Sequence, residues 1–311
     1  MAKLITSGKS SDSSKKASKK ASRKASKKRI ETVMQGLFFA CGLVTVAAVL
    51  LITVYLLVSG TPAIAKIGVF NFLFGKKWAS TASEPSFGIL PFILTSIYGT
   101  SGAIILGVPI GFFTAVYMSK FAPKAVKTVL MSAIDLLAGI PSVVYGLVGM
   151  LVIVPTIRKV FNVPDGASLL AAILVLSVMI LPSIVKVSVN ALDAVPKEYE
   201  DASLALGANK TETIFKISVP AAKSGIAASI VMGVGRAIGE AMAVMMVSGN
   251  VANMPSLFQS VRFLTTAVAS EMAYSEGLQQ QALFSIALVL YLFILMVNAI
   301  LNTILKKDKE H

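Results

Sequence analysis

The chain has 311 residues, of which 55% are hydrophobic and 14% are charged, yet its formal net charge is +14. A soluble domain usually has about a quarter of charged residues, so this composition indicates a protein whose solvent is largely lipid. The single cysteine, Cys41, excludes an internal disulfide framework, and the single histidine, His311, excludes the usual zinc sites and a histidine general base in any apolar segment.

The positive charge is concentrated at the N-terminus. Residues 1–33 carry 11 of the 29 basic residues and only two acidic ones, a net charge of +9. Residues 15–28 repeat a unit similar to KKAS with a period of four, and such low hydrophobicity and high charge predict a disordered tail. A nucleic-acid-binding arm is an alternative, but a solvated tail near anionic lipid is favoured, so no nucleic-acid partner is expected.

Six apolar stretches are long enough to cross a bilayer as helices, which takes about 20 residues each. They are residues 36–58, 94–118, 129–154, 168–185, 225–247 and 282–305. The first could instead belong to a signal peptide cleaved after Ala63-Ile64-Ala65, but its apolar run exceeds the usual 7–15 residues, so an uncleaved span is preferred. The sequence therefore predicts an all-α membrane protein with six transmembrane helices.

The distribution of lysine and arginine predicts how the spans are oriented. Basic residues gather in the tail, in the loops after the second and fourth spans, and after the sixth span. By the positive-inside rule, both termini are expected in the cytoplasm of a cell carrying this chain in its plasma (inner) membrane. The external loops would then be 59–93, with the only tryptophan, 155–167, and 248–281, which could hold a re-entrant or interfacial helix.

The expected parts of the chain follow from these spans. They are a basic disordered tail (1–33), a first transmembrane helix (34–58), an external segment (59–93), a five-helix core (94–305) and a cytoplasmic C-terminus (306–311). The core includes the longest cytoplasmic loop, 186–224. Its middle part, 196–215, favours a helix, because Pro196 suits a first turn and acidic residues stand near its start, and Gly207 should interrupt that helix.

Three short patterns that would indicate an enzyme are incomplete. Residues 8–10 lack the first glycine of a P-loop, residues 233–239 are one residue too long for a dinucleotide-binding loop, and residues 99–102 would need a histidine base that no span contains. The Gly-x-x-x-Gly spacings at 107–111 and 235–239 favour close helix packing instead. The sequence therefore predicts that the chain is not an enzyme.

Residues 201–220 read DASLALGANKTETIFKISVP. This segment resembles the E-A-A-x3-G-x9-I-x-L-P signature of permease subunits in binding-protein-dependent ABC importers. The matching positions are Asp201, Ala202, Ser203, Gly207, Ile217, Val219 and Pro220. The resemblance implies a MetI-like fold and a coupling helix that docks on an ATPase subunit. The residues themselves favour a small apolar face for a partner's groove, with a helix lying on the membrane as the alternative.

Three further stretches resemble the phosphate-specific permease of the PstC type. They are residues 87–93, 137–146 and 235–250, and the Phe-Gly-Lys-Lys-Trp sequence at 74–78 also matches that type. The resemblance implies a phosphate importer that works by alternating access with a second permease of the PstA type, an ATPase dimer of the PstB type and an external binding protein of the PstS type. ATP hydrolysis would reside on the separate ATPase, and no cofactor is implied for this chain.

Two charged residues, Arg236 and Glu240, fall inside the predicted fifth span. Their spacing of four places them on one face of a continuous helix, and unpaired charges in lipid are unfavourable, so both should face the bundle interior. A guanidinium is well suited to bind phosphate oxygens. We expect Arg236 to lie on the phosphate path and Glu240 to hold or gate it, as the resemblance to the family's span-5 pair also implies; a structural ion pair is the alternative.

The third and fourth spans contain further polar or helix-breaking residues. Asp135 is expected to be structural, capping backbone groups or pairing with Lys186, and Pro141 and Pro182 should interrupt their helices. The substrate alternatives are another oxyanion such as molybdate or sulfate. A secondary transporter or channel that uses Arg236 and Glu240 as an ion relay is a further possibility at this stage.

Overall fold

The computed structural model describes the backbone of residues 5–307, and the side chains of residues 31–301 and 303. It divides into two units, residues 1–57 and 58–311. The first unit belongs to a single helix, α1 (Ile5–Ile67), whose part from Glu31 to Ile67 is long and apolar enough to cross a membrane. This candidate span contains the first predicted span.

Helix α1 includes the basic tail from Ile5 onward, where the sequence predicts disorder over residues 1–33. Alanine and lysine, which make up most of the period-four repeat, are good helix formers, so the repeat is compatible with extending the helix that follows it. Residues 1–4 of the expected tail and residues 308–311 of the expected C-terminus lie outside the described residues.

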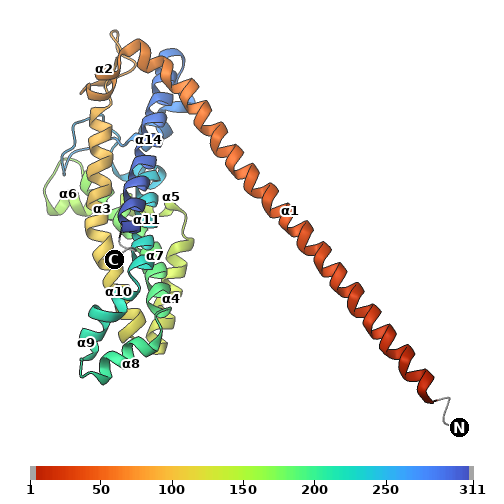
Figure 1. Ribbon diagram of the computed structural model, residues 1–311. Helices are drawn as coiled ribbons and strands as arrows, with labels where there is room; N and C mark the ends of the chain where they lie inside the picture. Colours follow the sequence, from red (N-terminus) through yellow and green to blue (C-terminus); the bar gives the residue numbers. More distant parts are fainter. Residues whose placement is uncertain (1–4, 308–311) are drawn as a thin grey trace. The chain divides into compact units, whose positions relative to one another are not determined.

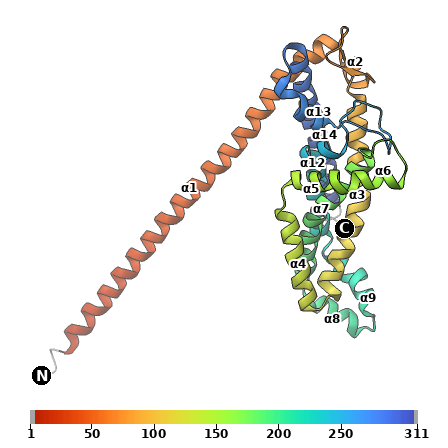
Figure 2. The same ribbon diagram turned by 180° about the vertical axis from the view of Figure 1, so that it is seen from behind.

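The second unit is built from helices and one small hairpin (Figures 1 and 2). Its elements are α2 (Val69–Phe74), β1 (Trp78–Ala79), β2 (Ser86–Phe87), α3 (Leu90–Val116), η1 (Tyr117–Phe121), α4 (Lys124–Gly139), α5 (Ser142–Val148), η2 (Gly149–Ile153), α6 (Val154–Val160), α7 (Leu169–Asp193), α8 (Lys197–Ala205), α9 (Lys210–Thr213), η3 (Ile214–Ser218), α10 (Val219–Ala221), α11 (Lys223–Gly239), α12 (Met242–Val247), α13 (Leu264–Glu271), η4 (Met272–Tyr274) and α14 (Gly277–Lys307). The turns η1, η2 and η3 are π-helical.

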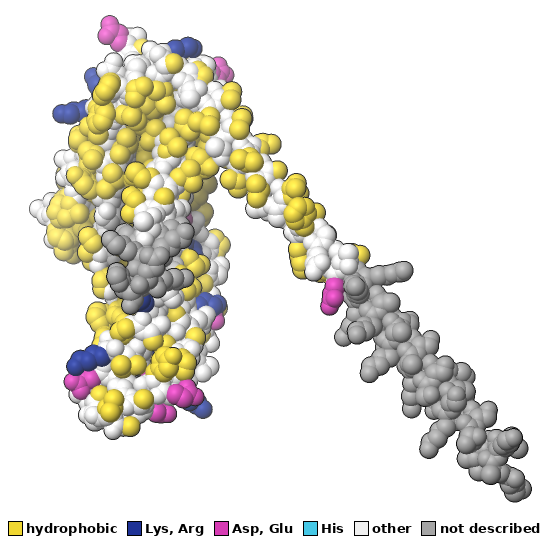
Figure 3. All heavy atoms as spheres, in the orientation of Figure 1, with side chains coloured by type: hydrophobic (Ala, Val, Ile, Leu, Met, Phe, Trp, Pro, Cys, Tyr) yellow, Lys and Arg dark blue, Asp and Glu magenta, His cyan; other side chains and the backbone are white. Residues whose placement is uncertain are grey.

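The arrangement places different elements at the two ends of this unit. Helices α3 and α14 run along its length, α5 and α6 lie across it, and α8 and α9 stand at the end opposite α2 (Figures 1 and 2). On the face shown in Figure 3, most charged side chains lie toward the two ends, and hydrophobic ones are frequent between them. This distribution is expected of a protein whose middle part lies in hydrocarbon.

Within the part of the chain that the structure describes, five helices are individually long and apolar enough to cross a membrane, namely Glu31–Ile67, Leu90–Phe121, Ser142–Val160, Leu169–Asp193 and Gly277–Leu301. A sixth span exists only if the pair Lys210–Ala221 and Lys223–Gly239, bent by 69°, counts as one. The fold is therefore all-α with five to six candidate spans. The predicted third span is replaced by α4 and by a candidate span that begins after Pro141.

The predicted interruption at Pro141 is confirmed. α4 ends at Gly139, and Ile140 and Pro141 are extended before α5 begins, because proline lacks the backbone N–H and disfavours helical geometry in the residue before it. The predicted interruption at Pro182 is wrong, since α7 continues through that residue. A proline can be accommodated where neighbouring groups surround the helix.

The prediction of one continuous helix over 225–247 is also wrong. α11 ends at Gly239, Glu240 is extended with ψ 127°, and α12 begins at Met242. The long polar loop starts later than expected as well, because α7 extends to Asp193 and so includes Lys186. The region 248–281 contains α13 and η4, and residues 155–167 contain most of α6.

Helix α7 is the centre of the packing. Gly102, Gly107 and Gly111 of α3 face isoleucines of α7, and a Cβ atom at any of them would lie 2.6–2.8 Å from an isoleucine carbon. This confirms the close packing predicted at 107–111. Farther along the same helix, Ser188 of α7 and Ser229 of α11 share a hydrogen bond of 2.9 Å. The spacing at 235–239 does not serve such packing within the described residues, since a Cβ at either glycine meets none of their atoms within 4 Å.

Candidate functional site

The break between α11 and α12 contains the two charged residues of the predicted fifth span. Arg236 lies in the last turn of α11, and Glu240 is the first residue after that helix. Both side chains are half-buried. Because the helix ends between them, the expectation that they share one face of a continuous helix is wrong.

Glu240 is tied to the chain that follows it. Its Oε1 accepts a hydrogen bond of 3.0 Å from the backbone N–H of Ala243, in the first turn of α12. Its backbone carbonyl accepts a hydrogen bond of 2.8 Å from the hydroxyl of Thr265 in α13. The carboxylate therefore satisfies a backbone donor that the start of a helix leaves unpaired.

Arg236 makes no ion pair or hydrogen bond within the described side chains of residues 31–301, and none with Glu240. Its charge does act on the hydroxyl of Tyr145 in α5. The guanidinium thus stands at the break of α11 and near the start of α5, with its donors available to a ligand or to another chain.

The second break lies against the first. The Tyr145 hydroxyl donates a hydrogen bond of 2.7 Å to the backbone carbonyl of Leu137 in α4, the carbonyl whose usual helical partner would be the N–H that Pro141 lacks. Gly146 lets α5 approach α12, because a Cβ atom there would lie 2.8 Å from the Cα of Ala243. Two interrupted helices are therefore joined at their breaks.

Asp135 is paired with Lys186, as anticipated in one of the two structural alternatives. The carboxylate oxygen and the lysine nitrogen are 2.7 Å apart, and both side chains are about half exposed. The ion pair links α4 to α7. An exposed pair of this kind contributes about 0–1 kcal/mol to stability, so it links the two helices only weakly.

The segment with the ABC permease signature folds as two short helices. α8 contains Asp201, Ala202 and Ser203, and the chain then turns at Gly207, whose φ of +88° confirms the predicted interruption. α9 starts with a capping box formed by Asn209 and Glu212.

The signature residues are divided between surface and interior. Asp201 and Ala202 are exposed, together with Leu206, which is 90% exposed. The Ser203 hydroxyl shares a hydrogen bond of 3.0 Å with Thr213. Ile217 of η3 and Val219 of α10 are half-buried. Pro220 of α10 is exposed. The start of the signature is therefore exposed, and part of its end is packed against the rest of the chain.

Sequence reasoning missed an ion pair beside this segment. Lys120 of η1 is paired with Glu200 of α8, and Ser218 of η3 donates to the same carboxylate over 2.9 Å. Burial by itself would raise the pKa of Glu200, but the hydrogen bonds from Lys120 and Ser218 and the charges of Lys120 and Lys197 outweigh it and lower that pKa. The two partners are 80 residues apart, so no spacing in the sequence pairs them.

The end of the second unit opposite α8 has charged residues of its own. Arg262 is paired with Glu271 and donates over 2.7 Å to the backbone carbonyl of Asn250.

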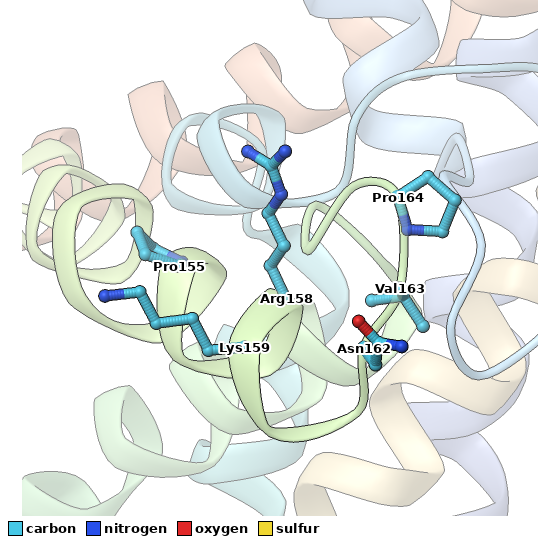
Figure 4. A pocket seen from close by; sticks show the side chains of 6 residues that line it. All are labelled: Pro155, Arg158, Lys159, Asn162, Val163 and Pro164. Carbon is cyan, nitrogen blue, oxygen red and sulfur yellow. The ribbon is translucent and has the colours of Figure 1, made fainter.

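A separate cavity of about 640 Å³ is lined by Pro155, Arg158, Lys159, Asn162, Val163 and Pro164. In Figure 4 the side chains of Arg158 and Lys159 point to different sides, so they do not converge on one anion.

Comparison with known proteins identifies the family. The model of the family "Binding-protein-dependent transport system inner membrane component" matches residues 107–310. The Bacillus subtilis protein described as "Probable ABC transporter permease protein YqgH" is 41% identical over 268 residues, covering 83% of this chain and 87% of that protein. The phosphate transport system permease protein PstC of Pasteurella multocida is 31% identical over 261 residues, covering 78% and 81%.

Solved structures with the same fold come from ABC transporters. A chain of a bacterial alginate ABC transporter has a TM-score of 0.59 at 14% identity, covering 86% of this chain and 92% of that one. A chain of the MetNI methionine ABC transporter has a TM-score of 0.56 at 17% identity, covering 71% and 97%. Permeases of this kind are not enzymes themselves and work with an ATPase and a substrate-binding protein. The chain belongs to the family of binding-protein-dependent transport system inner membrane components, the membrane-embedded permeases of ABC importers.

Proposed function

We propose that this chain is the permease subunit of an inorganic phosphate importer. One observation carries the proposal: a half-buried guanidinium without an ion-pair partner in the described residues stands at a helix break, in a chain 31% identical to a phosphate permease. With a second, homologous permease, the chain forms the translocation path by alternating access.

Arg236 is the proposed phosphate-contacting residue. A guanidinium presents five N–H donors in a planar fork, which suits the oxygens of an oxyanion. An unpaired charge in hydrocarbon is unfavourable by at least about 2.5–3.5 kcal/mol, so this side chain is expected to face an aqueous path or a polar group of the neighbouring permease. Glu240, four residues on, is proposed to hold or gate this path from the same break.

The partners follow from this role. Residues 201–220 are proposed to dock on an ATPase of the PstB type, present in two copies, which hydrolyses ATP in place of this chain. The second permease is proposed to be of the PstA type, and the external binding protein of the PstS type. The exposed start of the signature, with Leu206 beside it, supports the docking role. Both termini are proposed to lie in the cytoplasm of the cell that carries the chain in its plasma membrane.

The competing substrates are molybdate and sulfate. A secondary transporter or channel has no further support, because the chain belongs to an ABC importer family. The decisive experiment is uptake of radiolabelled phosphate by a strain that lacks its own phosphate permease and expresses this chain with its three partners. Phosphate should enter, and excess sulfate or molybdate should not compete. Competition by either oxyanion would contradict phosphate as the substrate.

The same assay tests the path. Arg236→Ala should abolish uptake while the complex still assembles, because the donors for the oxyanion are lost but no contact within the described chain is broken. Arg158→Ala is the matched control, since Arg158 is an exposed arginine of α6 away from the break. Wild-type uptake in Arg236→Ala would show that the path does not use this residue.

A further inference from the structure

We propose that η1, the turn that follows α3, is the joint that transmits movement of the coupling segment (residues 197–220) into the membrane-embedded helices. The joint consists of Ser119, Lys120 and Phe121 in η1. This role rests on the proposed docking of residues 201–220 on an ATPase, and it concerns residues that neither the signature nor the predicted path includes.

Three consecutive residues of η1 contact three different elements. The Ser119 hydroxyl donates a hydrogen bond of 2.6 Å to Asp193 at the end of α7. Lys120 is paired with Glu200 of α8. The ring of Phe121 lies under the Lys210 ammonium of α9, 5.0 Å from its centroid. Both short helices of the coupling segment, α8 and α9, are therefore attached directly to η1, and Figures 1 and 2 show them at the same end of the unit.

The central contact is the least exposed ion pair near the coupling segment. The side chains of Lys120 and Glu200 are 10% and 25% exposed, whereas those of Lys216 and Glu212, in the same segment, are 74% and 44% exposed. Removing one partner of a shielded pair leaves the other charge uncompensated, so such a pair resists separation better than an exposed one. Ser218 adds a third element by donating to Glu200.

The backbone of the joint also differs from an ordinary helix. Both η1 and η3 are π-helical turns, which occur within α-helices frequently at functional sites. Asp193 binds Lys127 of α4 as well as Ser119, with a lysine nitrogen to carboxylate distance of 2.6 Å. The joint therefore contacts the end of α7, which is also bound to α4, and it contacts the coupling segment through Glu200.

A displacement at the joint has a continuous route to the break at Glu240. The glycines of α3 fix it closely against α7, so the two helices are expected to move together. Toward its other end, α3 holds α13, because the Ser96 hydroxyl accepts a hydrogen bond of 3.0 Å from the Leu264 N–H. The next residue, Thr265, donates to the Glu240 carbonyl over 2.8 Å. The joint is therefore linked through α3 and α13 to the proposed phosphate path.

The test uses the complete transporter in proteoliposomes, with uptake per ATP hydrolysed as the readout. Lys120→Met and Glu200→Gln remove one charge each and keep side-chain length. Each should retain the ATPase at the wild-type level on co-purification but lower uptake per ATP by about tenfold, which lies within the usual range of coupling between sites. The charge-swapped variant Lys120→Glu/Glu200→Lys should recover much of the loss.

The matched controls are Lys186→Met and Asp135→Asn, which break the exposed pair between α4 and α7, outside the docking segment, and should leave uptake per ATP unchanged. Wild-type coupling in both Lys120→Met and Glu200→Gln would overturn the proposal. Loss of ATPase co-purification would overturn it too, because the pair would then only maintain the docking surface. A charge swap as impaired as the single variants would exclude a pairwise role.

A second measurement is independent of the transported substrate. After Cys41→Ser, spin labels at residues 105 and 199, both at exposed positions of α3 and α8, report the distance across the joint. It should be equal in the nucleotide-free and ATP-trapped complexes and should change between them only in Lys120→Met. If this distance changed between the two states while Lys120 is still present, α3 and α8 would not move together, and the proposed transmission would be overturned. If the wild-type complex imports a different oxyanion, the phosphate proposal fails, and the joint is tested by these distances and with that oxyanion.

Discussion

Glu240 combines a structural contact with a charge at the proposed path. Its carboxylate caps α12 by accepting from the Ala243 N–H, and an amide oxygen could accept the same hydrogen bond. A substitution can therefore remove the charge of Glu240 and still keep its hydrogen bond to the start of α12. The proposed gating role needs the charge, whereas the helix break needs only the acceptor.

Glu240→Gln is expected to keep the unfolding temperature of the wild type but to lower phosphate uptake, because it keeps the acceptor and loses the charge. Glu240→Leu should lose both, with a destabilisation of about 0.5–2 kcal/mol from the missing cap. Thermal unfolding of the purified complex and phosphate uptake are measured on the same preparations. Normal uptake in Glu240→Gln would restrict this residue to capping.

Glu200 should make the stability of the complex depend on pH. Its pKa in the folded chain is lowered by Lys120 and Ser218, compared with about 4.3 in an unfolded chain. A lowered pKa gives stability that is complete above the unfolded value and is lost as the pH falls through the folded value. The difference in unfolding temperature between wild type and Glu200→Gln should therefore be constant at neutral pH and shrink below about pH 4.

The control for this titration is Glu198→Gln, an exposed glutamate of the same helix, which should follow the wild-type curve at every pH. A difference between wild type and Glu200→Gln that stays constant down to pH values well below 4 would contradict the ion pair as its source.

At the level of the elements, two interrupted helices meet next to the turn of α11 that carries Arg236. α5 and α12 both begin just after a break, and they contact each other at Gly146 and Ala243. A side chain at 146 would separate them and disturb the region around Tyr145 and Arg236. The close approach of these short helices is thus part of the proposed path.

Gly146→Val is expected to destabilise the complex by about 1–3 kcal/mol, the usual effect of overfilling a packed contact, and to impair uptake. Gly139→Ala is the matched control, because a Cβ atom at that glycine meets nothing within 4 Å. Thermal unfolding and uptake provide the measurement. Equal stability of the two variants would show that α5 and α12 do not pack as described.

The sequence was sufficient for some elements and not for others, for physical reasons. Long apolar runs identified the regions of the candidate spans, and Pro141 indicated its break through the missing N–H. The break at Glu240 has no proline, and its contacts come from Ala243 and from Thr265 in a distant helix. Lys120 and Glu200 meet only after α3 and α8 have been placed by tertiary packing. Contacts of this kind leave no periodic signal.

On the scale of the whole molecule, the joint at η1 determines which parts share one side of the membrane. The hairpin β1–β2 lies directly before α3, and η1 lies at the other end of this candidate span. Because Lys120 of η1 is paired with Glu200, α8 must stand on the same side as η1. If α3 crosses the bilayer, the hairpin and α8 therefore face opposite compartments, and the excess of lysine and arginine near η1 and α8 favours the cytoplasm for that side.

Cysteine labelling in intact cells tests this arrangement after Cys41→Ser. Thr81→Cys, exposed between β1 and β2, should react with a membrane-impermeant maleimide from outside. Leu206→Cys, at a position 90% exposed after α8, should react only once the membrane is permeabilised. Labelling of both sites in intact cells would mean that α3 does not separate them, and the reverse pattern would invert the orientation. Only the predicted pattern leaves Lys120 and Glu200 on the side where ATP is available to a partner ATPase.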